Sequence, residues 1–105
     1  MKPLAKNALP PKVRRSLQKL GEDLRTARLR RNITVAQLAE RAGVSSGTIL
    51  RLEHGDPGVG LGTLMLGMWL LGLNDRLMNL AEETQDPVGL ALEAEQRRKR
   101  ARRSS

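Results

Sequence analysis

Hydrogen-bonding side chains of several kinds are concentrated in one short segment, residues 45–54. The apolar residues Val44, Ile49 and Leu52 would lock a helix in this segment onto its neighbour, which leaves the polar side chains on the opposite face. An exposed helix of this width fits the major groove of duplex DNA. The positions left to face such a partner are Ser46, Gly47, Thr48, Leu50, Arg51 and His54.

Two short helices joined by a tight turn are predicted to position these side chains. The segment Thr34-Val35-Ala36-Gln37 has the Thr-x-x-Gln pattern of a capping box, which predicts the start of the first helix. Gly43 can end that helix in the left-handed conformation, and Ser45 can cap a second helix that runs to about Glu53. Ala39 is small, as a crossing of the two helices requires. The pattern therefore predicts a helix-turn-helix.

Three further helices are predicted, so the expected fold class is all-α with five helices. Ser16 is the candidate N-cap of the first helix, which ends near Arg31–Asn32. Its apolar stripe consists of Leu17, Leu20, Leu24 and Ala27. The fourth helix covers roughly residues 61–71. The fifth covers about residues 75–84, and its inward residues are expected to be Leu77, Leu80 and Ala81.

The fourth predicted helix is apolar on both sides, which indicates burial on both sides. One side can pack on the core of its own chain, through Leu61, Leu64, Met65, Met68 and Leu71. The other side needs a different cover, and a second copy of the chain is the simplest candidate. We therefore expect a homodimer whose interface includes Leu66, Trp69, Leu70 and Leu73.

The formal net charge of +8 is carried by the two ends of the chain. Residues 1–16 hold five Lys or Arg and no acidic residue, and residues 93–105 hold six against two. We expect a basic, flexible N-terminal arm over residues 1–15, a folded domain over residues 16–85, and a basic C-terminal tail over residues 86–105 that is ordered at most when bound. Basic arms favour polyanions, either nucleic acid or an anionic membrane. For the C-terminal tail, non-specific DNA affinity, docking of a protein partner and solubility stay open as alternatives.

Composition disfavours several other classes of protein. With no Cys and one His, the chain is expected to hold no metal site, no cofactor and no catalytic constellation. The longest apolar run, residues 61–73, falls short of the ~20 residues that span a bilayer. The glycine-rich stretch 58–62 lacks the lysine of a phosphate-binding loop and is interpreted as an interhelical loop. A membrane-surface protein and an enzyme are the minor alternatives.

The segment from Leu20 to about Leu73 resembles the phage-repressor, or Xre-type, family of five-helix, lambda-repressor-like DNA-binding domains. The motif that carries the resemblance is QLAERAGVSSGTILRLE, residues 37–53. The chain further along resembles HipB-type antitoxins of toxin–antitoxin modules. The segments that carry this resemblance are EHGDPGVGLGTLM, then DPVGLALE, and the basic end.

This resemblance implies a dimeric transcriptional repressor that binds an inverted-repeat operator in double-stranded DNA and regulates its own promoter. It also implies a HipA-type kinase toxin as protein partner, and a cytoplasmic, nucleoid-associated location that suits a chain without Cys. A generic Xre-family regulator without a toxin partner is the open alternative, and the neighbouring reading frame would distinguish the two.

The resemblance also assigns roles to individual residues. Ser46, Gly47 and Arg51 would face base edges, and Arg51 could donate two hydrogen bonds to one guanine. Ser45 and Thr48 would reach phosphates. Because Gly47 has no side chain, Arg51 and the shape of the DNA would share the recognition.

Outside the recognition helix, Arg28 matches a family arginine that pairs with the glutamate matching Glu53 and can also face the DNA backbone. Thr34, at the start of the second helix, is a further DNA-binding candidate. Val35 stands where the family often has a Gln that contacts DNA, and its side chain cannot form that hydrogen bond.

Overall fold

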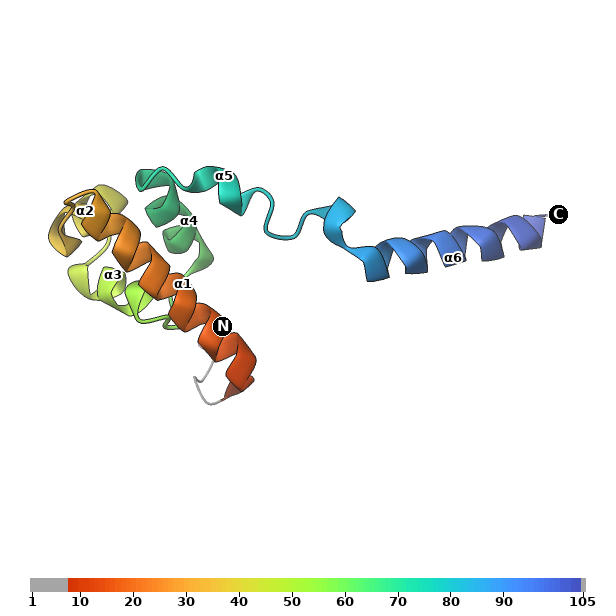
Figure 1. Cartoon of the computed structure of the whole chain (residues 1–105), viewed down its shortest axis with the longest axis horizontal. Coiled ribbons are helices and arrows are strands. Elements are labelled where there is room, and N and C mark those ends of the chain that lie inside the picture. The colour runs from red at the N-terminus through yellow and green to blue at the C-terminus, as the bar shows by residue number, and fades with distance from the viewer. Residues whose placement is uncertain (1–7, 105) are drawn as a thin grey trace. The chain divides into compact units, whose positions relative to one another are not determined.

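The computed structural model describes residues 8–104, and that part of the chain contains α-helices, turns and no strand (Figure 1). The all-α prediction is confirmed. The α-helices are α1 (Pro11–Arg30), α2 (Val35–Ala42), α3 (Ser46–Glu53), α4 (Leu61–Leu70), α5 (Asn74–Leu77) and α6 (Pro87–Ser104). A short 3₁₀ helix covers Glu83–Gln85.

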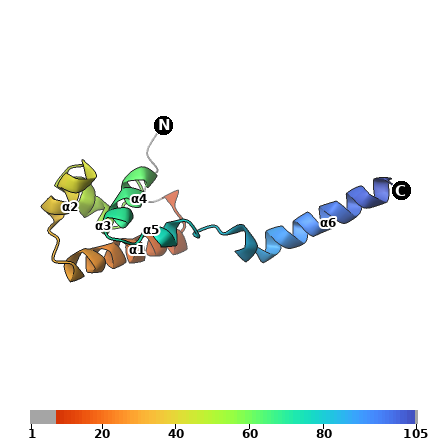
Figure 2. The same ribbon diagram turned by 90° about the horizontal axis from the view of Figure 1, so that it is seen from above.

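The chain divides into two units, residues 1–74 and residues 75–105. In the first unit, α3 packs against both α1 and α2, and α2 also packs against α4. Figure 2 shows α1 along one side of this unit, with α2, α3 and α4 all lying to the same side of it. The second unit holds most of α5, the 3₁₀ helix and α6.

The core of the first unit is small and aliphatic. Its centre consists of Leu38, Ala39 and Ile49, which are all buried. Burying aliphatic side chains drives the folding of this unit, at about 25 cal/mol per Å² of apolar surface removed from water. The residues packed around this centre are Ile33, Val35, Val44 and Leu70. Further buried residues come from α1 (Leu24 and Ala27) and from α4 and its end (Met68 and Leu71).

The turn between α2 and α3 forms as the sequence predicts. The Gln37 N–H donates to Thr34 Oγ1 (3.0 Å), and the Thr34 N–H donates to Gln37 Oε1 (2.9 Å), which completes the capping box. Gly43 ends α2 in the left-handed region, with a φ of 68°. Ser45 Oγ then caps α3 by accepting from the Thr48 N–H (3.2 Å). These local bonds fix the direction in which α3 leaves the turn.

Two glycines let α1 lie directly against the backbone at the end of α3. A Cβ on Gly21 would lie 2.7 Å from the carbonyl carbon of Glu53, and a Cβ on Gly55 would lie 2.7 Å from the backbone nitrogen of Gln18. Gly55 also has a φ of 75°, where side chains are disfavoured. Main-chain atoms of α1 and of the end of α3 therefore lie close together at these two glycines, which leaves little room for either helix to shift.

The first helix begins earlier than predicted. α1 starts at Pro11, so Ser16 is not its N-cap and residues 11–15 are not part of a flexible arm. Pro11 occupies the first helical position, where a fixed φ and a missing N–H suit a helix start. Ser16 Oγ instead donates to the carbonyl of Lys12 inside the helix (3.0 Å). The expectation for residues 1–7 lies outside the described residues.

The fifth helix is shorter than predicted, because α5 ends at Leu77. The expectation that Leu80 and Ala81 point inward is wrong: Leu80 is 72% exposed, and Ala81 is exposed as well. The reason is that these residues belong to the second unit, in whose described part no residue is buried.

The C-terminal tail is helical, which corrects the expectation of a segment ordered only when bound. Asp86 caps the first turn of α6 by accepting from the Gly89 N–H (3.0 Å). Ion pairs between residues four apart then occur along the helix, with each acidic residue on the N-terminal side, the favourable orientation. None of the helices that the structure describes is long and apolar enough to cross a membrane.

Candidate nucleic-acid interface

α3 presents one polar face to solvent and anchors the other in the core. Ile49 is fully buried at 0% exposure, and Leu52 and Glu53 are buried beside it. The exposed residues of α3 and its cap lie on the opposite side, at Ser46, Gly47, Leu50, Arg51 and His54, while Thr48 is half-buried. A helix that is held on one face and open along the other has the geometry needed to enter a groove.

Arg51 is held by a short chain of hydrogen bonds along this face. Its Nη2 donates to Thr48 Oγ1 (3.2 Å), and Thr48 Oγ1 is 3.0 Å from Ser45 Oγ. These hydrogen bonds hold the guanidinium of Arg51 alongside α3, where the remaining N–H groups of Arg51 can donate to an acceptor. Ser45, Thr48 and Arg51 are thus brought together. Ser46 and Gly47 lie on the exposed side with them.

Arg28 and Glu53 form a buried, two-pronged ion pair between α1 and α3. Arg28 Nε donates to Glu53 Oε2 (2.7 Å), and Nη2 donates to Oε1 (2.9 Å). Arg28 Nη1 donates to the carbonyl of Ile33 (3.0 Å). Hydrogen bonding to Glu53 raises the pKa of the Arg28 guanidinium above its ordinary value, so the guanidinium stays charged.

This geometry corrects one predicted site residue. The sequence predicts that Arg28 faces the DNA backbone as well as pairing with Glu53, but its side chain is only 8% exposed and its donors are directed at Glu53 and Ile33. Its role in the structure is to fasten α3 to α1. The predicted pairing with Glu53 is confirmed.

The start of α2 lies at the surface. Thr34 is exposed, and its Oγ1 accepts the Gln37 N–H, which leaves the hydroxyl proton to donate to a phosphate. Val35 packs against the core, so its side chain makes no surface contact of the kind that a Gln could make. The positive end of the α2 dipole adds attraction for an anion at this position.

A family model described as a helix-turn-helix domain matches residues 19–78, more than half of the chain. The chain belongs to the helix-turn-helix domain family. Neither the curated proteins nor the solved structures compared with it give a match. The matched segment contains α2, α3 and α4 in full. The match supports the resemblance of the helix-turn-helix domain to Xre-type domains.

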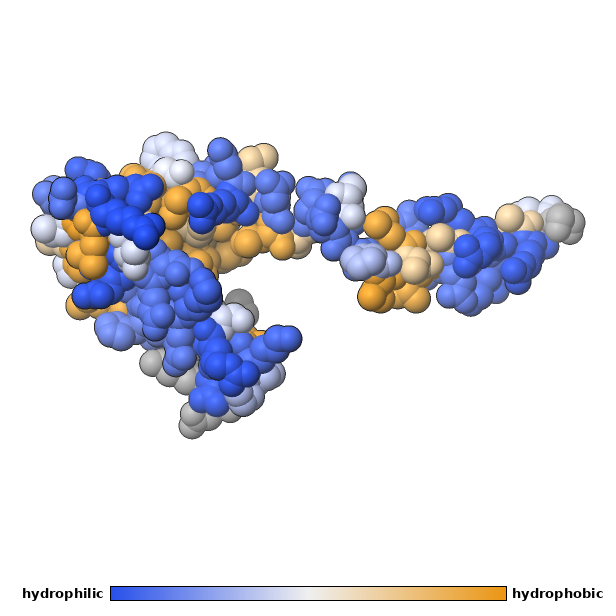
Figure 3. Space-filling view, in the orientation of Figure 1, coloured by the Kyte–Doolittle hydropathy of each residue, from blue (hydrophilic) through white to orange (hydrophobic). Residues whose placement is uncertain are grey.

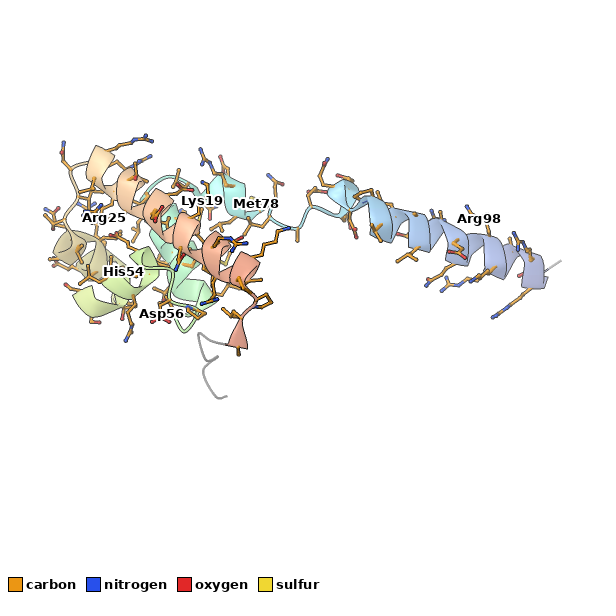
Figure 4. All side chains as sticks on the ribbon, turned by 60° about the horizontal axis from the view of Figure 1, so that its bottom comes forward. Lys19, Arg25, His54, Asp56, Met78 and Arg98 are labelled. Atoms are coloured by element: carbon orange, nitrogen blue, oxygen red, sulfur yellow. The ribbon has the colours of Figure 1, made fainter. Side chains whose placement is uncertain are left out.

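An open groove beside α3 extends the exposed surface of the helix-turn-helix domain. It lies between α1 and α3, and its exposed lining residues are Gln18, Glu22, Arg25, Leu50 and His54. Figure 4 labels Arg25 on α1 and His54 at the end of α3. The sequence reasoning missed the α1 residues of this groove. Their signal is a spacing of four and then three residues along α1, which puts Gln18, Glu22 and Arg25 on one helical face.

The helix-turn-helix domain also exposes an apolar strip along α4, which we call the α4 strip. It consists of Leu61 (67% exposed), Met65 (43%), Leu66 (37%) and Trp69 (60%). Figure 3 shows apolar surface over the region of α4. Exposed side chains of this size are expected on a surface that another protein covers.

The α4 strip differs in part from the predicted interface. Leu66 and Trp69 belong to it, whereas Leu70 packs against the core of its own chain and Leu73 is half-buried. Leu61 and Met65, which the sequence places on the inner side, are instead exposed. The inner side of α4 is formed by Leu64, Gly67, Met68 and Leu71, with spacings of three, one and three residues.

Proposed function

We propose that this protein is a transcriptional repressor that binds double-stranded DNA through α3. The observation that carries the proposal is the exposed face of α3, on which Arg51 is held by Thr48 and Ser45 while the opposite face is fixed by Ile49. Arg51 donates to guanine, and the hydroxyl groups bind phosphates. The protein acts by occupying its operator and carries out no catalysis.

The repressor acts as a dimer. Two copies pair through the α4 strip, which supplies exposed aliphatic and aromatic area of the kind found at interface centres. A two-fold axis then presents two α3 helices to successive major grooves, about 34 Å apart, and the operator is an inverted repeat. The protein works in the cytoplasm, at the nucleoid.

The test is DNase footprinting and titration on the DNA upstream of the gene that encodes this chain. Arg51→Ala should weaken operator binding by roughly 1–3 kcal/mol and relax the preference at one base pair. Arg76→Ala removes an exposed arginine on α5 and is the matched control, which should leave the preference at every base pair unchanged. An Arg51→Ala protein with wild-type affinity and preference would refute the assignment of α3.

We further propose that the repressor is the antitoxin of a toxin–antitoxin pair and binds a HipA-type kinase toxin. The support is the resemblance of the segments around residues 53–65 and 86–93 to HipB-type antitoxins. Co-purification with the product of the adjacent gene, together with a kinase assay of that product with and without this chain, tests the proposal. A regulator without a toxin partner would show operator binding and no effect on the neighbouring product.

A further inference from the structure

The C-terminal half of α6 carries positive charge on every side. Its cationic residues are Arg97, Arg98, Lys99, Arg100, Arg102 and Arg103. Successive residues of an α-helix point about 100° apart. Arg98 and Arg102 therefore lie on one flank of α6, and Arg100 and Arg103 lie on the opposite flank. Figure 3 shows the hydrophilic surface of this half, and Figure 4 labels Arg98 on it.

The carboxylates of α6 are fewer than its cations. Glu93 pairs with Arg97 (2.6 Å) and Glu95 pairs with Lys99 (3.5 Å), both at exposed positions one turn before the cation. These pairs stabilise the middle of the helix. The cations after them lie near the C-terminus of α6, where the helix dipole favours positive charge. α6 is therefore helical without a polyanion, and it carries six cations against two carboxylates.

The distribution of the charge distinguishes between kinds of partner. A membrane surface or a flat acidic protein face meets one side of a helix, and half of these cations would then point away from it. A groove of duplex DNA has a phosphate backbone on each side, so both flanks of a helix that lies in it face phosphates. With its side chains an α-helix is about 10–12 Å across, which fits a major groove roughly 12 Å wide.

We propose that the C-terminal half of α6 lies in the major groove of duplex DNA and binds the phosphates on both sides without reading sequence. This site is separate from α3, since α6 belongs to the other unit of the chain. It does not depend on the proposed function, because binding through α6 requires no operator.

The experiment measures binding of the full-length protein to a random-sequence duplex over a range of salt concentrations. Two double variants are compared with the wild type: Arg98→Gln with Arg102→Gln, and Arg100→Gln with Arg103→Gln. Both keep the Glu93–Arg97 and Glu95–Lys99 pairs. Each double variant should lower the slope of log K against log salt by about two, because each neutralised phosphate contributes roughly 0.9 to that slope. Far-UV circular dichroism checks that α6 stays helical in both.

Equal reductions of the slope in the two variants support a helix in a groove. A reduction in only one variant overturns the proposal in favour of a one-sided contact. No reduction in either overturns it in favour of a partner other than DNA. Failure here is distinguishable from failure of the α3 assignment, because Arg51→Ala is judged on base preference and these variants are judged on random DNA.

Discussion

The ion pair between Arg28 and Glu53 gives a sharp test of how α3 is held. In Glu53→Gln the amide has nearly the shape of the carboxylate, but it carries no charge and offers one acceptor oxygen in place of two. Arg28 would then be a buried cation without a counter-charge. Its side chain is 8% exposed and that of Glu53 is 4% exposed, so water cannot replace the missing partner.

Breaking a buried pair in this way destabilises a protein by about 3–5 kcal/mol. That is a large share of the roughly 5–15 kcal/mol of a typical domain. With a urea dependence of about 2 kcal/mol per molar, the unfolding midpoint should fall by roughly 2 M. The raised pKa of Arg28 means that its contribution is fully present at neutral pH and is lost only as the pH rises through that raised value. The difference between variant and wild type should therefore stay constant from neutral to mildly alkaline pH.

The assay is urea unfolding monitored by circular dichroism, with Asp23→Asn as the matched control. Asp23 pairs with Lys19 (2.7 Å) on the exposed side of α1, and removing that pair should leave the midpoint unchanged within error. Replacing both buried partners, in Arg28→Met with Glu53→Leu, should restore much of the stability because no charge is left buried. If Glu53→Gln cost no more than Asp23→Asn, the reasoning about α3 would be refuted.

Three further predictions concern the packing, the cap and the dimer. Gly21→Ala should lower the melting temperature, because the new Cβ would lie 2.7 Å from the carbonyl carbon of Glu53 and 2.8 Å from the carbonyl oxygen of Leu52. Gly47→Ala should instead stabilise α3 by roughly 0.5–1 kcal/mol. The nearest neighbour of its new Cβ would be Ser45 Oγ, at 3.7 Å. Thr34→Ala removes the cap of α2 and should cost about 1 kcal/mol in urea unfolding, with Ser16→Ala as a control that removes no cap. Trp69→Glu should convert a dimer into a monomer in sedimentation velocity, whereas Met78→Glu, at a residue that is 78% exposed outside the α4 strip, should not.

The helix-turn-helix could be predicted from sequence because its determinants are local. The capping box joins residues three apart, and the left-handed residue Gly43 comes directly after α2. Ser45 and Thr48, again three residues apart, start α3. Such bonds need no knowledge of the rest of the fold, so the bounds of α2 and α3 can be derived from the residues themselves.

The predictions that failed depended on information outside the segment concerned. Pro11 can interrupt a helix or start one, and the outcome depends on whether the residues after it continue the helix. Leu80 and Ala81 have the spacing of a buried face, but burial requires a neighbouring element that the spacing does not supply. The basic charge of residues 97–103 suggests disorder, whereas the pairs with Glu93 and Glu95 and the favourable dipole position allow a helix.

The two DNA-binding surfaces that we propose have separable effects on binding. α3 is clamped to α1 by the Arg28–Glu53 pair and by the close approach at Gly21, so binding to DNA needs little reordering of the recognition face. Phosphate contacts from α6 raise affinity for operator and random DNA by the same factor, because phosphates carry no sequence. Neutralising α6 should therefore lower both affinities and leave their ratio unchanged. Arg51→Ala should lower the ratio, since the base contact that it removes exists only at the operator.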